Sequence, residues 1–163
     1  MVPVFLCGFM GCGKSTVGRI VAKKTERAFV DLDEYIEDAA GISIPEIFER
    51  YGESHFRTLE AEAIKIFDQS FTVVALGGGA VINDRSRALA NKAGLVIFID
   101  TPFDLCYDRI KDDGHRPIAK SSTKEELKAR FDARYPVYLS ASSVRVDGSL
   151  TPDEIAMKII EVM

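Results

Sequence analysis

The residues from Gly8 to Ser15 have the types and spacing needed to hold a phosphate group. They read Gly-Phe-Met-Gly-Cys-Gly-Lys-Ser and fit the pattern G-x-x-x-x-G-K-[ST]. The glycines allow successive backbone N–H groups to point at an anion. Lys14 would bring a positive charge to the β- and γ-phosphates, and Ser15 would offer a hydroxyl to Mg²⁺. This loop predicts a nucleoside triphosphate site, but it does not say what is done with the nucleotide.

The flanking residues support this interpretation of the loop. Residues 3–7 are mostly apolar, as in a buried strand, and Val17, Ile20 and Val21 follow at helical spacing. A helix that starts at the loop would add its unpaired N–H groups and the positive end of its dipole to the phosphate site. The alternative, an accidental glycine-rich turn, rarely has a strand before it and a helix after it.

Four further segments, 28–31, 71–76, 95–100 and 144–147, predict strands that alternate with helices. Because the longer of these strands are continuous apolar runs, we expect an α/β fold of the three-layer sandwich type. Its central five-stranded parallel sheet would carry helices on both faces. At 163 residues, the whole chain, 1–163, is expected to form a single domain.

Two aspartates follow the second predicted strand. Asp31 and Asp33 are one residue apart, and on one strand their side chains would point the same way, one toward Mg²⁺ and the other toward a substrate hydroxyl. The alternative is a solvated turn that caps a helix over 34–40. Asp100 also ends an apolar strand, so the residues alone leave Asp31 and Asp100 as rival metal ligands.

Three glycines and three arginines lie near the other predicted strand ends. The triplet 77–79 after a buried strand would expose backbone N–H groups beneath a small ligand, or form a flexible turn. Arg57 and Arg134 could bind a carboxylate through their forked guanidinium groups, although either alone is typical of a helix surface. Arg116 lies in the polar segment 111–122, which is typical of a lid that closes over a phosphoryl group.

Ser122 and Glu125 predict a capping box, followed by a helix to about Tyr135.

The composition limits the possible partners. The net charge of −4 argues against a general nucleic-acid binder, and no run of eighteen apolar residues predicts a membrane span. The first residues lack the basic region of a signal peptide. Three cysteines without metal-ligand spacing suit a reducing cytosol. We therefore expect a cytoplasmic protein that acts on small molecules, and no feature demands more than a monomer.

Taken together, these motifs resemble the shikimate kinase family of the P-loop group. The matching motifs, in chain order, are the loop 8–16, D-x-D at Asp31 and Asp33, F-R-x-x-E at Phe56, Arg57 and Glu60, the triplet 77–79, R-P at Arg116 and Pro117, and R-x-P-x-Y at Arg134, Pro136 and Tyr138. The chain departs from the family pattern at Ile118, where Leu is common, and at Leu139 and Ser140, where acidic residues are common.

This resemblance implies ATP-dependent phosphorylation of the 3-hydroxyl of shikimate. The products would be shikimate 3-phosphate and ADP, in a step of chorismate and aromatic amino acid biosynthesis. The cofactor would be Mg²⁺, with ATP as co-substrate. The acceptor would bind a helical part at about 33–60, and a mobile lid would span about 111–122.

The resemblance also implies a role for each matching residue. Catalysis would involve Lys14, Asp33 and Arg116. Mg²⁺ would be held by Ser15 and, through water, by Asp31 rather than Asp100. Nucleotide contacts would come from Gly11, Cys12, Gly13, Lys14, Ser15, Thr16, Arg109, Arg116 and Pro152. Acceptor contacts would come from Asp33, Phe48, Phe56, Arg57, Glu60, Gly77, Gly78, Gly79, Arg116 and Arg134.

Two other functions are compatible with the phosphate loop. One is a regulatory module that binds nucleotide without transferring phosphate. The other is a kinase for a different small polyol or sugar acid.

Overall fold

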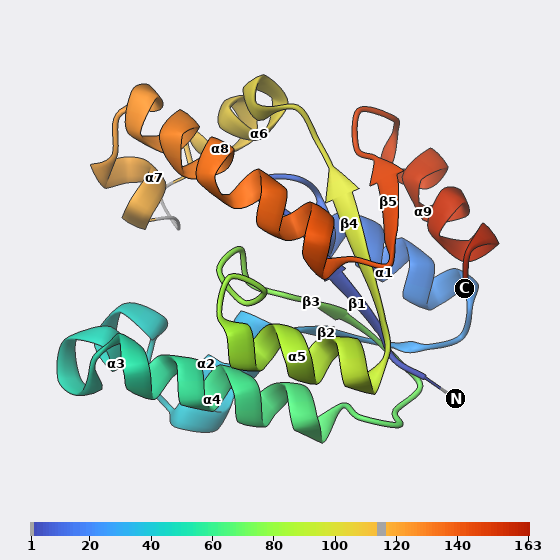
Figure 1. Cartoon of the computed structure of the whole chain (residues 1–163), viewed down its shortest axis with the longest axis horizontal. Helices are drawn as coiled ribbons and strands as arrows, with labels where there is room; N and C mark the ends of the chain where they lie inside the picture. The colour runs from blue at the N-terminus through green and yellow to red at the C-terminus, as the bar shows by residue number, and fades with distance from the viewer. Residues whose placement is uncertain (1, 114–116) are drawn as a thin grey trace.

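The strands of the protein form one parallel sheet in the order β2-β3-β1-β4-β5 (Figure 1). The computed structural model describes residues 2–113 and 117–163. Within them the strands are β1 (Val4–Cys7), β2 (Ala28–Asp31), β3 (Thr72–Ala75), β4 (Leu95–Asp100) and β5 (Val144–Asp147). Every neighbouring pair runs parallel, which confirms the predicted five-stranded sheet.

Helices cover both faces of this sheet. They are α1 (Lys14–Lys24), α2 (Leu32–Ala40), α3 (Ile44–Tyr51), α4 (Glu53–Ile66), α5 (Asp84–Ala93), α6 (Phe103–Ile110), α7 (Pro117–Ser121), α8 (Lys124–Ala141) and α9 (Pro152–Glu161). Helices α1 and α9 pack together on one face, and α4, α5 and α8 lie over the other (Figure 1). Right-handed crossovers place α1 opposite α4, α5 and α8, because the chain moves toward one sheet edge after β1 and toward the other edge after β2, β3 and β4.

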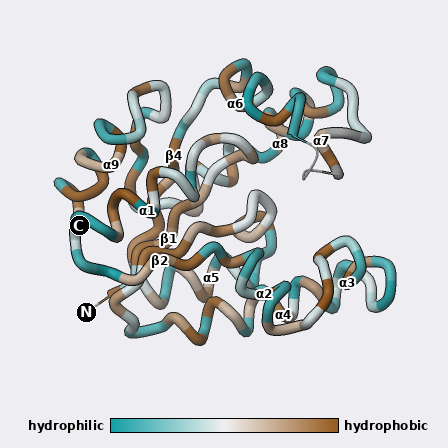
Figure 2. The backbone as a smooth tube through the Cα atoms, turned by 180° about the vertical axis from the view of Figure 1, so that it is seen from behind, coloured by the Kyte–Doolittle hydropathy of each residue, from teal (hydrophilic) through white to brown (hydrophobic). Residues whose placement is uncertain are grey.

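The core lies along the inner strands, where hydrophobic segments gather in Figure 2. All residues of β1 and β3 are buried, as expected for strands covered on both faces. Helix α1 approaches the sheet closely at Gly18, where an added Cβ would lie 2.6 Å from a ring carbon of Phe29. Among the described residues, no helix has the length and apolar character needed to cross a membrane.

The strand register gathers the chemically distinctive segments at one edge of the sheet. Asp31, the last residue of β2, pairs with Ala75, the last residue of β3. The glycine triplet 77–79 follows one residue later, and the phosphate loop follows β1 between β3 and β4. The carboxyl ends of β1, β2 and β3 therefore position the loop, the aspartates and the glycines side by side.

Asp33 lies on a helix and not on the strand that carries Asp31. Strand β2 ends at Asp31 and α2 begins at Leu32. The reason is capping, because Asp31 Oδ1 accepts hydrogen bonds from the backbone N–H groups of Asp33 (3.1 Å) and Glu34 (3.3 Å). The prediction that both aspartates share one strand face is wrong.

The start of α8 is one residue later than predicted. Thr123 Oγ1 accepts from the N–H of Glu126 (3.1 Å), and Glu126 Oε2 accepts from the N–H of Thr123 (3.2 Å). This reciprocal pair is a capping box. The sequence offers Ser122 and Glu125 at the same spacing, so local pattern alone does not separate the two registers.

Helix α8 also extends past its predicted end near Tyr135. It continues through Pro136, which has no N–H to donate, as far as Ala141. The continuation buries Tyr138 and Ala141. Tertiary packing therefore outweighs the local preference of proline to interrupt a helix.

The capping register of α8 can be tested by replacing each candidate cap with alanine. We expect Thr123→Ala to lower the free energy of unfolding by about 1 kcal/mol, because the N–H of Glu126 loses its partner. Ser122→Ala should change it by less than about 0.5 kcal/mol. Chemical denaturation of both variants measures the difference, and a larger loss in Ser122→Ala would contradict the assigned register.

Candidate active site

The phosphate loop holds the Lys14 ammonium above its own backbone. Lys14 Nζ donates to the carbonyl oxygens of Gly8 (2.8 Å) and Phe9 (3.1 Å). Both partners are uncharged, so these bonds orient the positive charge without neutralising it. Gly13, the residue before α1, has a φ of 102°, which side chains other than glycine rarely adopt. The loop thus adds the positive charge of Lys14 to the amino end of a helix, and both attract a bound anion.

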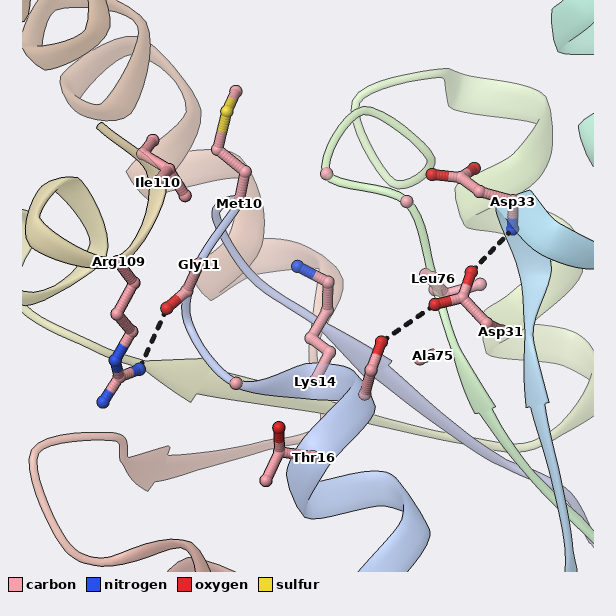
Figure 3. Close-up of a pocket in the computed structure, with 14 residues that line it drawn as sticks. Met10, Gly11, Lys14, Thr16, Asp31, Asp33, Ala75, Leu76, Arg109 and Ile110 are labelled. Carbon is pink, nitrogen blue, oxygen red and sulfur yellow. Dashed lines mark hydrogen bonds between the residues drawn. The ribbon is translucent and has the colours of Figure 1, made fainter. Parts of the chain in front are cut away.

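A cavity beside the loop brings together many of the predicted residues (Figure 3). Those that line it are Gly11, Gly13, Lys14, Ser15, Thr16, Asp31, Asp33, Gly77, Gly78 and Arg109. Figure 3 shows Asp31 and Asp33 on one side, Arg109 on the other and Lys14 between them. The cavity therefore spans from the phosphate loop to the glycine triplet.

The residues beside the loop suit a hard divalent cation. Ser15 Oγ donates to Asp31 Oδ2 at 2.8 Å, so a hydroxyl and a carboxylate oxygen already lie together. Across residues 2–113 and 117–163, no group of three or more His, Cys, Asp or Glu is placed to enclose a metal. Mg²⁺ typically binds through one or two protein oxygens, substrate phosphates and water, so this donor set fits it.

The rival metal ligand, Asp100, is engaged elsewhere. Its Oδ2 accepts from the Tyr135 hydroxyl (2.8 Å) and lies 3.3 Å from Nε of Arg145. Asp100 lines a separate groove on the other side of β4. The geometry therefore favours Asp31 for the metal.

Asp33 has the electrostatic character of a base that titrates near neutral pH. Burial is the main cause that raises its pKa to about 6, and the nearby carboxylate of Asp31 raises it further. Lys14 and Arg57 act in the opposite direction because their positive charges favour the ionised form. At pH 7 the carboxylate is mostly ionised, and its proton affinity is raised.

Each glycine of the triplet faces one charged side chain. A Cβ on Gly77 would lie 2.7 Å from Oδ1 of Asp33, and one on Gly79 would lie 2.7 Å from Nη2 of Arg57. A Cβ on Gly78 would lie 3.4 Å from Nη1 of Arg134. The missing side chains thus allow three groups from α2, α4 and α8 to converge on one strip of backbone.

Arg57 is held from behind by a buried carboxylate. Glu60 is only 1% exposed, and its two oxygens lie 3.0 and 3.2 Å from Nη1 of Arg57. Burial raises the pKa of Glu60, and the charge of Arg57 opposes that rise. On the same helix, the ring of Phe56 packs 5.0 Å from that of Phe48.

The predicted nucleotide contacts differ in where they lie relative to the cavity, and of Cys12, Pro152 and Arg109, which the structure describes, only Arg109 lines it. Cys12 is buried beneath the loop, and Pro152 begins α9 without lining the cavity. Arg109 is exposed and donates from Nη1 to the Gly11 carbonyl at 2.9 Å. Arg116 lies outside the described residues, so its role stays a prediction.

Two polar residues were not assigned a role from the sequence. Thr101 Oγ1 is within hydrogen-bonding distance of the carbonyls of Cys12 (3.0 Å) and Gly148 (3.3 Å), so it ties the phosphate loop to the segment before α9. The Tyr138 hydroxyl donates to the Gly78 carbonyl at 2.6 Å. The sequence marked Thr101 only as a threonine just after a strand, and it marked Tyr138 only as the last residue of the R-x-P-x-Y motif.

Comparison with known proteins identifies the family. The family model for shikimate kinase matches residues 10–163. A shikimate kinase of Geobacter sulfurreducens is 49% identical over 146 residues, which cover 88% of this chain and 80% of that protein. One from Thermodesulfovibrio yellowstonii is 39% identical and covers 99% and 94%. The structure of a shikimate kinase from Acinetobacter baumannii in complex with shikimate superposes with a TM-score of 0.92 at 32% identity, covering 99% and 92%. The chain therefore belongs to the shikimate kinase family.

Proposed function

We propose that this protein transfers the γ-phosphoryl group of ATP to the 3-hydroxyl of shikimate, giving shikimate 3-phosphate and ADP. The observation that carries this proposal is the convergence of Asp33, Arg57 and Arg134 on the glycine triplet beside a phosphate-binding loop. One group can accept a hydroxyl proton and two can bind a carboxylate. A small ring bearing both functional groups satisfies all three.

The donor side of the reaction uses the phosphate loop. Backbone N–H groups of residues 11–16 would bind the β-phosphate, and Lys14 would exchange its carbonyl partners for the γ-phosphate oxygens. Mg²⁺, when bound with ATP, neutralises charge on the phosphates, and Ser15 with Asp31 would hold it. Arg109 and Pro152 would contact the base, and Arg116 would approach the transferring group.

The acceptor side would orient the hydroxyl toward the γ-phosphate. Arg57 and Arg134 would bind the carboxylate of shikimate in forked geometry, with Glu60 keeping the Arg57 guanidinium in position. Asp33 would accept the proton of the shikimate hydroxyl. At the same time the hydroxyl oxygen would bond to the γ-phosphorus, and the bond between the γ-phosphorus and ADP would break. Because Asp33 touches the triplet at Gly77, the hydroxyl and the carboxylate would be bound at opposite ends of the same strip.

The remaining contacts belong to the same proposal. Gly77, Gly78 and Gly79 would form the floor of the acceptor site, and Phe48 and Phe56 would complete its wall. We infer that residues 1–163 act as a single P-loop kinase domain, with an acceptor-binding part at about 33–60 and a lid at about 111–122. We also infer that it acts as a monomer in the cytoplasm, and its three free, buried cysteines suit that reducing compartment.

A coupled assay of ADP release tests the function directly. With Mg-ATP and purified protein, we expect ADP release to depend on shikimate and the product to carry phosphate on the 3-hydroxyl. Gluconate serves as the control acceptor. Turnover of gluconate without turnover of shikimate would favour a different polyol kinase, and nucleotide binding without any turnover would favour a regulatory module.

The pH dependence of the reaction tests Asp33. Burial raises the pKa of Asp33 to about 6, so below that value its carboxyl is protonated and cannot accept the hydroxyl proton. We expect kcat/KM for shikimate to fall as the pH decreases through about 6 in the wild type. Asp33→Asn should lower kcat by about 100-fold or more while ATP still binds. A variant that retains most of its kcat, with the same acid limb, would rule out this role.

Gly79→Ala tests whether the glycine triplet sets the position of Arg57. The added Cβ would lie 2.7 Å from Nη2 of Arg57, so the guanidinium must move. We expect KM for shikimate to rise about tenfold, as for a weakened charged hydrogen bond, with KM for ATP unchanged. Gly41→Ala is the control, because nothing lies within 4 Å of its Cβ and only stability should change. Equal KM values in both variants would contradict the assignment.

A further inference from the structure

Tyr138 is a buried hydroxyl that binds the middle of the glycine triplet. Its side chain is 1% exposed, and its hydroxyl donates to the Gly78 carbonyl at 2.6 Å. The ring stacks on Phe98 of β4 with centroids 5.3 Å apart. Burial raises the pKa of the Tyr138 hydroxyl, so it remains protonated and able to donate. The sheet thus fixes the ring, and the ring fixes the hydroxyl.

The triplet needs such a partner because its backbone has little intrinsic preference. Glycine loses more conformational freedom on ordering than any other residue. The Gly77 carbonyl accepts from the N–H of Ala80 (3.0 Å), and the Gly79 carbonyl accepts from the N–H of Ile82 (3.2 Å). These bonds hold both ends of the triplet, whereas its middle carbonyl is held by the Tyr138 side chain.

Fixing the Gly78 carbonyl also fixes the next N–H group. The carbonyl of Gly78 and the N–H of Gly79 belong to one planar trans peptide unit, in which they point in opposite directions. With the carbonyl directed at Tyr138, the N–H of Gly79 is directed away from α8. One tyrosine hydroxyl therefore sets the orientation of the peptide unit next to Arg57.

The same helix supplies the arginine that faces Gly78. Arg134 is four residues before Tyr138 on α8, so the two side chains lie on one helix face. Nη1 of Arg134 lies 3.4 Å from the position of a Cβ on Gly78, and the positive charge of Arg134 is close enough to the Tyr138 hydroxyl to oppose the rise in its pKa. Arg134, Tyr138 and Gly78 thus form one connected unit.

We propose that Tyr138 is a positioning residue for the acceptor site. Its hydroxyl holds the Gly78–Gly79 peptide unit at a fixed orientation and a fixed distance from Arg134, so the site is preorganised for a small carboxylate-bearing acceptor. Tyr138 acts through these neighbours and does not contact the transferring phosphoryl group. This inference rests on the proposed function for the identity of the acceptor.

Steady-state kinetics of Tyr138→Phe test the proposal. The variant keeps the ring on Phe98 and removes only the hydroxyl. We expect KM for shikimate to rise about fivefold or more, as for one lost hydrogen bond, while KM for ATP and kcat stay within about twofold. Tyr135→Phe is the matched control on α8, because it loses the bond to Asp100 and should leave KM for shikimate unchanged.

The proposal is overturned if KM for shikimate in Tyr138→Phe stays within about twofold of the wild type, or if KM for ATP rises equally. A merely structural role predicts lower stability without this split between the two KM values. Hydrogen exchange of the peptide covering 77–80, measured without substrates, should be faster in Tyr138→Phe and unchanged in Tyr135→Phe. Unchanged exchange in Tyr138→Phe also overturns the proposal. A wild type that binds but does not phosphorylate shikimate would contradict the proposed function alone.

Discussion

The carboxylate of Asp31 connects the two halves of the site. One oxygen accepts from Ser15 at the start of α1, and the other accepts from the backbone of Asp33 at the start of α2. Both helix amino ends are electropositive, so a single negative charge between them is stabilised from two sides. The metal-side hydroxyl and the candidate base are thereby held at fixed positions relative to each other. Shortening or removing this carboxylate would free both helix starts at once.

The charge balance of the site explains how an acidic chain can bind anionic ligands. The chain has a net charge of −4, but Lys14 lines the cavity, and Arg57 and Arg134 face the strip of glycines beside it. Asp33 stands among them with a raised pKa because burial and Asp31 both disfavour its ionised form. The cations partly offset this, and their opposing effects leave a carboxylate that is ionised near neutral pH yet is a stronger base than an ordinary aspartate.

The sequence predicted the features that depend on local pattern, and it failed where distant segments decide. Short motifs predict the phosphate loop and the glycine triplet, and apolar runs predict the sheet. Asp31 and Asp100 both end apolar strands, so pattern could not separate them. Strand order favours Asp31, because β2 and β4 lie on opposite sides of β1 and Asp100 is bound by Tyr135 and Arg145. The shift of Asp33 onto α2 had a detectable signal in the capping preference of Asp31. The motif that contains Tyr138 and the position of Thr101 after a strand did not reveal what these residues bind, because each partner is a backbone carbonyl far away in the sequence.

The acceptor side shows why buried polar groups are kept despite their cost. Burial raises the pKa of Glu60, so holding its carboxyl group in the ionised form costs folding free energy relative to the unfolded chain. An apolar residue would pack there without this penalty, but it could not hold the guanidinium of Arg57 against Gly79. The buried Tyr138 hydroxyl is a second such polar group, because it holds the Gly78 carbonyl. A guanidinium group fixes a bound carboxylate only if the guanidinium itself is held in place. The groups that hold it must lie on its buried side, away from water. The order of the proposed acceptor site thus depends on buried polar bonds and not on apolar packing alone.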